Sequence, residues 1–169
     1  MSNRRRRKTG NAVTDTKDMP GHLVRRFQQI AVAIFHAEVA DAGFDITPVQ
    51  YAALVAVQQN PGIDQVTLAG LIAYDRTTIT GVVDRLAQKG FVARRPSSRD
   101  RRARELQITD EGREALKRIQ PAVEEAQRIM LRGLDAEESD EFMRLLRKAI
   151  DAVNDLSRAP LKTGAGGGK

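Results

Sequence analysis

Residues 75–90 constrain the fold more than any other part of the chain. The apolar positions of this segment follow the i, i+3, i+4 and i+7 spacing of one helical stripe, and they are Ile79, Val82, Val83 and Leu86. Gly90 is a favourable residue for ending such a helix. At about 100° per residue, the opposite side carries only small or polar side chains. We therefore expect a helix that buries one stripe and presents a nearly uncharged face.

The outward face of this helix differs from an ordinary solvated surface, which more often carries Glu and Lys. The face and its flanks include Thr77, Thr78, Thr80, Gly81 and Arg85. Gly81 lies in the middle of the helix, where glycine costs about 1 kcal/mol relative to alanine. A face that is small and hydroxylated is suited to close approach to another surface.

The next segment, residues 91–109, is predicted to form a β-hairpin with a basic tip. Residues 91–93 and 106–109 are typical of strands, and residues 96–98 (Pro-Ser-Ser) favour a turn. Six arginines lie between positions 94 and 104, with a single acid among them. Because guanidinium groups so close together repel one another, the pattern indicates a polyanionic partner. The candidate contact residues are Arg99, Asp100, Arg101, Arg102 and Arg104.

Helical periodicity predicts further helices at about residues 23–42, 48–58, 64–73, 110–130 and 136–153. Thr47 is a favourable N-cap, Pro48 is tolerated at the first helical position, and Gly43 ends the preceding helix. The expected order is four helices, two strands and two helices. The fold class is mainly α with a small β-hairpin wing (α+β).

This order predicts a winged helix-turn-helix, in which residues 75–90 form the helix that enters the major groove of double-stranded DNA. Hydroxyl groups of Thr77, Thr78 and Thr80 can bond to base edges or phosphates. Arginines of the hairpin can reach the flanking minor groove, where a narrow groove attracts guanidinium groups. The expected partner is therefore DNA.

Composition argues against several other classes of protein. The chain has no cysteine, which excludes disulfides, thiol chemistry and cysteine-ligated zinc. No apolar run approaches the roughly 20 residues that cross a bilayer and no signal peptide is evident, so a cytoplasmic location without membrane attachment is expected. His22 and His36 have no metal-ligand partner at short spacing, and no nucleotide-binding motif is present. We expect neither an enzyme, nor a cofactor, nor a metal site.

Residues 75–113 resemble the central signature of the MarR family of bacterial transcriptional regulators. The helix ends in VDRL and KG, the hairpin contains DRRAR, and the next helix begins with ITDEG. The likeness extends in element order over about residues 22–156. It implies an obligate homodimer joined by the first and the last two helices, bound to a pseudo-palindromic operator. By position, Asp100 and Arg102 would be the acid and the groove-contacting arginine of the wing.

The resemblance also implies a small effector, often a phenolic or aromatic acid, whose binding releases the DNA. It places effector pockets where the first two helices and the last long ones meet the DNA-binding lobe. The candidates there are Phe35, His36, Phe44 and Tyr51. A single histidine or aromatic ring on a helix is more often a core or interface residue, so both interpretations stay open. The family's cysteine-based peroxide sensing cannot apply to this chain.

The domain organisation that follows is a disordered basic tail at 1–19, an N-terminal dimerisation helix at 20–46, a winged helix-turn-helix domain at 47–109, C-terminal dimerisation helices at 110–157 and a flexible tail at 158–169. The expected function is that of a sequence-specific repressor with an aromatic acid ligand. The alternative is a sequence-tolerant architectural DNA-binding protein without a ligand response, acting through counterion release by its basic tail and wing. The threonine face argues against it, because phosphate-only binding would favour Lys and Arg there.

Overall fold

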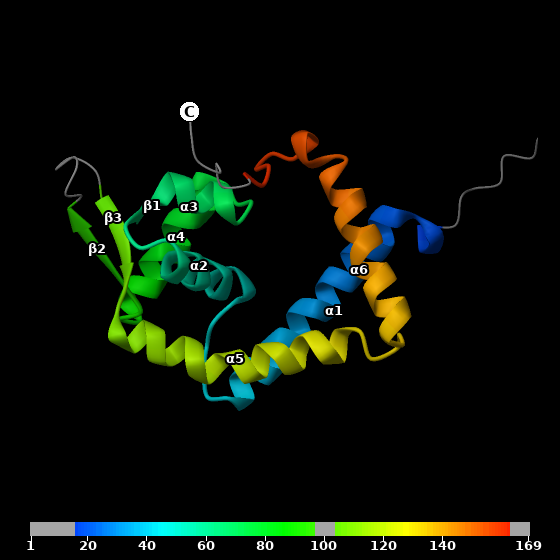
Figure 1. Ribbon diagram of the computed structural model, residues 1–169, viewed down its shortest axis with the longest axis horizontal. Coiled ribbons are helices and arrows are strands. Elements are labelled where there is room, and N and C mark those ends of the chain that lie inside the picture. The colour runs from blue at the N-terminus through cyan, green and yellow to red at the C-terminus, as the bar shows by residue number, and fades with distance from the viewer. Residues whose placement is uncertain (1–15, 97–103, 163–169) are drawn as a thin grey trace, which may run out of the picture.

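The computed structural model describes residues 16–96 and 104–162, and this part of the chain is mostly helical with one small antiparallel sheet (Figure 1). The α-helices are α1 (Pro20–Asp41), α2 (Pro48–Gln59), α3 (Gln65–Leu71), α4 (Arg76–Gln88), α5 (Asp110–Met130) and α6 (Ala136–Asp151). The strands are β1 (Ile63–Asp64), β2 (Val92–Pro96) and β3 (Arg104–Ile108). Two 3-10 turns, η1 (Thr16–Asp18) and η2 (Asn154–Leu156), lie outside the long helices.

The order of the long elements confirms the predicted fold class, which is mainly α with a β-hairpin wing. Strand β1 and the two 3-10 turns were not predicted. β1 pairs with β3, with Ile63 opposite Leu106, so the sheet order is β1-β3-β2. A strand of two residues is too short to produce the alternating pattern by which strands are found in a sequence.

The predicted boundaries of the wing strands were wrong. β2 and β3 continue further toward the tip than expected, with Arg95 opposite Glu105 and Pro96 opposite Arg104. Arg94, Arg95 and Arg104 therefore belong to strands and not to the tip. Arginine is not among the residues enriched in strands, but the strands are exposed here and Arg95 lies opposite the acid Glu105, which favours the pairing. Four of the predicted contact residues lie outside the described residues, namely Arg99, Asp100, Arg101 and Arg102.

Local sequence signals account for where the helices begin and end. The Thr47 hydroxyl accepts a hydrogen bond from the Gln50 backbone N–H, and the Gln50 side chain accepts one from Thr47, which completes a capping box before α2. α1 and α4 end next to Gly43 and Gly90, whose φ angles of 83° and 76° lie in the left-handed region that favours glycine. These ends agree with the expectations from the sequence.

The hydrophobic core joins the helix-turn-helix to the inner halves of α1 and α5. All four apolar stripe residues of α4 are buried, and Ile79, Val83 and Leu86 are 0% exposed. Phe35 and Val39 enter this core from α1, and other large buried side chains come from the remaining elements: Ile46, Leu54, Leu68, Leu106 and Ile119. The core fixes α4 against the sheet and against α5.

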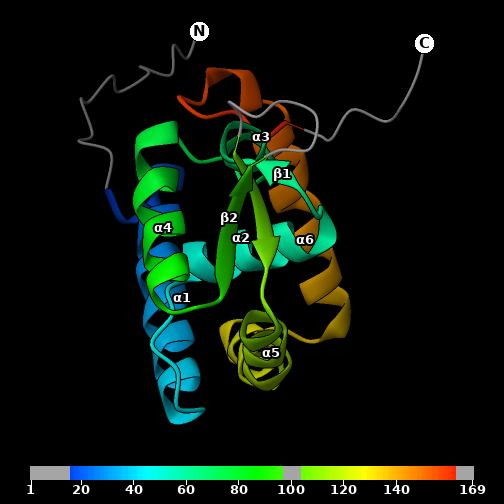
Figure 2. The same cartoon turned by 90° about the vertical axis from the view of Figure 1, so that its left-hand side faces the viewer.

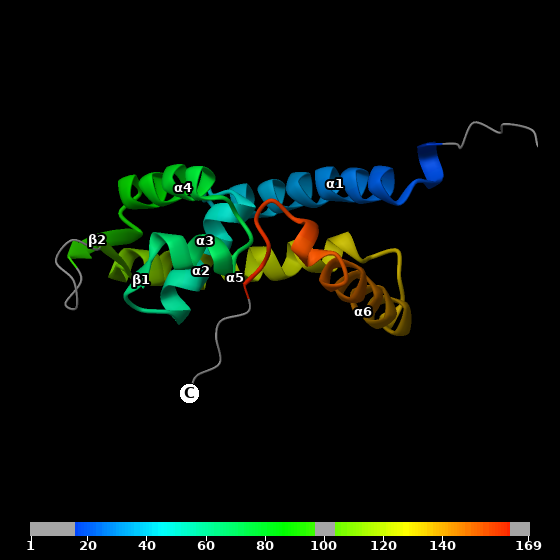
Figure 3. The same cartoon turned by 90° about the horizontal axis from the view of Figure 1, so that it is seen from above.

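The long helices extend away from this core. α1 and α5 pack against each other, and α6 lies at their far end (Figure 3). The rings of Phe27 in α1 and Phe142 in α6 meet edge to face, with centroids 5.6 Å apart. α6 buries none of its residues. Within residues 16–96 and 104–162, no helix combines the length and apolar character needed to cross a membrane.

Candidate nucleic-acid interface

The candidate recognition helix α4 begins at a side-chain cap. The Asp75 carboxylate accepts hydrogen bonds from the Thr78 backbone N–H at 2.9 Å and from the Thr78 hydroxyl at 2.7 Å. These bonds hold the pKa of Asp75 below its ordinary value. A carboxylate at this position also suits the positive end of the helix dipole.

The three candidate threonines of α4 are all exposed, but their hydroxyl groups are used differently. The Thr78 hydroxyl donates to Asp75, whereas the Thr80 hydroxyl donates to the Arg76 carbonyl at 2.9 Å and accepts from the Gln65 amide at 2.8 Å. The Thr77 hydroxyl makes no hydrogen bond to any residue that the structure describes. Thr77 is therefore the threonine whose donor is available to a partner, while Thr78 and Thr80 offer mainly acceptor capacity.

The middle of α4 is open on its outward side. Gly81 is exposed, and a Cβ atom built on it would meet no other atom within 4 Å. Packing inside the protein therefore does not explain this glycine. Gly81 and Arg85 line a shallow depression of about 290 Å³ together with Thr78, Val82 and residues at the start of α2: Thr47, Val49 and Gln50. Three of the five candidate residues of α4 thus border one concave surface, whereas Thr77 and Thr80 lie outside it.

The wing lies beside α4, and Figure 2 shows β2 as the strand next to that helix. An ion pair between Arg94 of β2 and Asp84 of α4 joins the two elements. This pair was not predicted from the sequence, which gave no reason to bring a residue of the helix and one of the hairpin together. Arg104, the one predicted wing contact within the described residues, is exposed at the start of β3.

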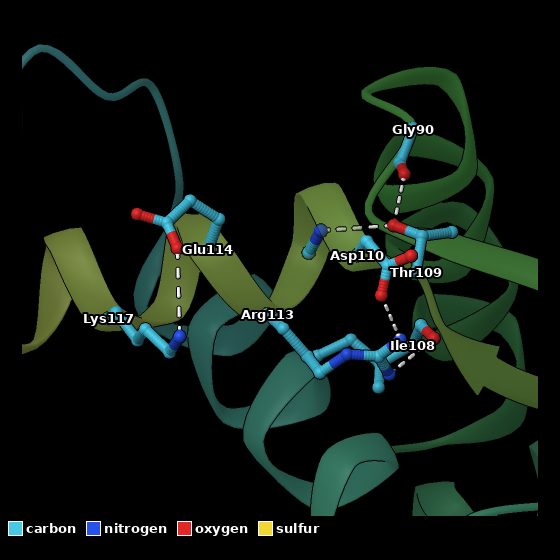
Figure 4. Close-up of polar contacts among 8 residues, drawn as sticks. Gly90, Ile108, Thr109, Asp110, Arg113, Glu114 and Lys117 are labelled. Carbon is cyan, nitrogen blue, oxygen red and sulfur yellow. Dashed lines mark hydrogen bonds and ion pairs between the residues drawn. The ribbon is translucent and has the colours of Figure 1, made fainter.

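A network of hydrogen bonds at the base of the wing ties α4, β3 and α5 together (Figure 4). The Thr109 hydroxyl donates to the Gly90 carbonyl at 2.6 Å and accepts from the Gly112 N–H at 3.0 Å, so that it also caps α5. The Thr109 N–H donates to the Phe91 carbonyl at 3.0 Å. A Cβ atom on Gly112 would overlap that carbonyl oxygen, which explains the glycine. These bonds therefore link the end of the recognition helix to the start of α5.

The structure brings three of the four candidate ligand residues close together and places the fourth, Phe44, beside a cation. Phe35 is 5% exposed and belongs to the core, and its ring centroid lies 6.1 Å from those of His36 and Tyr51. His36 itself is exposed. Burial, followed by the nearby Glu124 carboxylate, raises the pKa of the Tyr51 hydroxyl. Phe44 instead lies under the Arg118 guanidinium, 4.8 Å from its ring centroid.

Comparison with known proteins identifies the family. The model of the MarR family matches residues 46–103. The HTH-type transcriptional repressor NicR of Pseudomonas putida is 30% identical over 142 residues, which are 84% of this chain and 89% of NicR. The chain belongs to the MarR family. It is thus a MarR-type transcriptional regulator with a winged helix-turn-helix fold.

Two solved structures agree with this assignment. PcaV of Streptomyces coelicolor, solved with its natural ligand, is 34% identical and superposes with a TM-score of 0.76 over 84% of this chain and 99% of PcaV. BpsR of Bordetella bronchiseptica is 29% identical, with a TM-score of 0.75 over 80% of this chain and 96% of BpsR. The DNA binding of BpsR is regulated by 6-hydroxynicotinic acid.

Proposed function

We propose that this MarR-family regulator is a sequence-specific homodimeric repressor that a small aromatic acid releases from a pseudo-palindromic operator. The observation that carries the DNA-binding part is the outward side of α4, where a Cβ atom on Gly81 would meet no other part of the protein within 4 Å and Thr77 keeps a free hydroxyl group among the described residues. A small uncharged face lets the helix backbone approach base edges, whereas binding to phosphates alone would favour basic residues.

The wing supplies the electrostatic part of the proposed interface. The Arg94–Asp84 ion pair holds β2 against α4, so the strand that leads to the arginine-rich residues 99–104 is fixed beside the recognition helix. In this proposal Arg102 enters the minor groove, and Asp100 orients the Arg102 side chain. Phosphates of the DNA backbone are bound by Arg99, Arg101 and Arg104. Arg85 contacts the DNA from α4.

The proposed dimer forms through the helices outside the helix-turn-helix core. Large apolar side chains on α1 and α6 are exposed, among them Leu23 at 50%, Val24 at 60% and Leu145 at 48%. Exposed apolar patches of this kind mark interaction surfaces. A second copy of the chain would cover them, and its two-fold symmetry would match a pseudo-palindromic operator.

The proposed effector is an aromatic or phenolic acid, because BpsR, a similar protein, responds to 6-hydroxynicotinic acid. His36 is the candidate that can hydrogen-bond a carboxylate or ring hydroxyl, since it is exposed beside the rings of the core. Phe35, Phe44 and Tyr51 would supply apolar walls. His36→Ala should abolish release by the acid while leaving DNA affinity unchanged, and full release of this variant would place the pocket elsewhere.

The experiment that tests the proposal measures binding to the DNA upstream of the protein's own gene, with excess non-specific competitor at physiological salt. It is repeated with a panel of aromatic acids. We expect saturation at one dimer per site and reversal by at least one acid. Binding that the competitor abolishes, with no response to any acid, would instead support a sequence-tolerant architectural protein.

A further inference from the structure

The chain after α6 returns to the helix-turn-helix. Figure 1 shows this segment, residues 157–162, running from η2 back to α3. The Asn154 side chain holds it at both polar groups, since its amide N–H donates to the Leu161 carbonyl at 3.1 Å and its amide oxygen accepts from the Leu161 N–H at 2.8 Å. We name residues 157–162 the C-terminal return. It includes part of the segment expected from the sequence to be a flexible tail.

The C-terminal return docks on the end of α3. The Lys162 N–H donates to the Gly70 carbonyl at 2.9 Å. Gly70 lies in the last turn of α3, and its carbonyl also accepts a hydrogen bond from the Ala73 N–H at 3.4 Å, so the return adds a second and shorter bond to this acceptor. A Cβ atom on Gly70 would lie 2.8 Å from Cδ of Lys162, so the lysine side chain packs directly on this glycine.

This docking brings basic side chains to the N-terminal end of α4. Arg158 and Lys162 of the return line a depression of about 240 Å³ together with Arg76, the first residue of α4. The acid in that depression is Asp75, whose carboxylate accepts two hydrogen bonds from Thr78. Within the part of the chain that the structure describes, none of the three cations forms an ion pair.

Three cations that form no ion pair share this depression with one carboxylate, so its net positive charge favours the approach of a further anion. These cations lie beside the start of the recognition helix, and helices of this kind approach DNA through their N-terminal residues. The anion closest to them in a complex would therefore be a phosphate of the DNA backbone. We propose that Arg158 and Lys162 bind phosphates of the DNA backbone, so that the C-terminal return forms a third DNA contact besides α4 and the wing. This inference rests on the proposed DNA-binding function.

The test is the salt dependence of DNA binding by the full-length variant Arg158→Gln/Lys162→Gln. It is measured on the DNA upstream of the gene and on a duplex of unrelated sequence. Each lost phosphate contact lowers the slope of log K against log salt by about 0.9, so the slope should fall by about 1.8 for each protomer engaged. The affinity gap to the unaltered protein should then widen with each halving of the salt concentration, by about 3.5-fold for one engaged protomer and about 12-fold for the two protomers of a bound dimer. Both duplexes should be affected alike, because phosphate contacts carry no sequence information.

The matched control is Lys117→Gln/Arg132→Gln, which removes the same charge from the exposed surface of α5 and the turn after it. The slope of this control should stay within the error of the unaltered protein. If the two double variants give the same slope, the effect is one of net charge and the proposed contact is wrong.

Asn154→Ala tests the docking separately, because it keeps both cations and removes the side chain that holds the return. Its slope should lie between those of the unaltered protein and the Arg158→Gln/Lys162→Gln variant. A slope equal to that of the unaltered protein would overturn the docked geometry. If the unaltered protein binds neither duplex, the proposed function and this inference fail together, whereas normal binding with unchanged slopes in all variants refutes the inference alone.

Discussion

Replacing Gly81 by alanine should stabilise the protein and weaken its binding to DNA. Gly81 lies in the interior of a 13-residue helix, and the added Cβ would meet no atom within 4 Å. The substitution should therefore gain the full helix-propensity difference of about 1 kcal/mol. For a chain of this size, that raises the thermal midpoint by about 2–4 °C. The same methyl group would stand where the proposed interface needs the closest approach to DNA.

The loss of DNA affinity can be bounded in the same way. An extra methyl group forced into a well-packed contact costs about 1–3 kcal/mol, which corresponds to at least about a fivefold loss of affinity. Thermal and urea unfolding at one fixed protomer concentration, together with fluorescence anisotropy on the upstream DNA, measure both quantities. A stabilised Gly81→Ala protein that binds DNA as well as its parent would refute the close approach of α4.

Gly112→Ala is the matched control, since it is the same substitution in another helix. Here the Cβ would overlap the Phe91 carbonyl oxygen and lie 2.9 Å from Cγ1 of Ile108. Overpacking costs up to about 3 kcal/mol, and the gain in helix propensity offsets about 1 kcal/mol of this cost. Gly112→Ala should therefore destabilise the protein by about 2 kcal/mol. The two variants should therefore move the unfolding midpoint in opposite directions. Destabilisation of similar size in both would show that the outward side of α4 is packed.

Three further predictions concern the polar groups of α4. Thr77→Val should change the preference among operator variants without lowering the unfolding midpoint. Thr78→Val should change that preference and also lower the free energy of unfolding by about 1 kcal/mol, because it removes the hydrogen bond to Asp75. Equal losses of affinity on every DNA sequence would contradict base readout. Asp84→Asn should change the free energy of unfolding by less than about 1 kcal/mol, because the ion pair of Asp84 with Arg94 is partly exposed. The variant should nevertheless bind DNA measurably more weakly, because the wing is released from α4. Unchanged DNA affinity would show that the pair does not position the wing. The pKa of Asp75 is lowered in the folded protein, so the contribution of its carboxylate to stability is present above the ordinary value of 3.8 and is lost as pH falls below it. In an acid titration, the Asp75→Asn variant should therefore lose less stability below that pH than the unaltered protein does. An unchanged profile would exclude Asp75 as a contributor.

The sequence was sufficient to predict features that depend on neighbouring residues. The capping threonine Thr47, the helix-ending glycines Gly43 and Gly90, and the buried stripe of α4 all follow from interactions within a few positions of the chain. The fold class follows in turn from the order of these elements. Local signals are reliable here because the tertiary structure agrees with them.

Features that depend on distant residues could not be predicted in this way. Nothing in the spacing of Asp84 and Arg94 indicates that a helix and a strand will bring them together. The pairing of Arg95 with Glu105 depends on a register that the strand propensities do not fix. The docking of Lys162 on Gly70 joins residues from opposite halves of the chain, so the sequence alone indicated a flexible tail.

The network at the base of the wing gives α5 a mechanical role. Because Thr109 joins the end of α4 to the start of α5, a tilt of α5 carries the recognition helix with it. A helix of 21 residues is about 31 Å long, so a tilt of about 5° displaces one end by about 3 Å relative to the other. That displacement is close to the rise of one base pair, about 3.4 Å. In the proposed dimer, α5 would act as a lever that converts a small rearrangement among the long helices into a mismatch with the spacing of the operator half-sites.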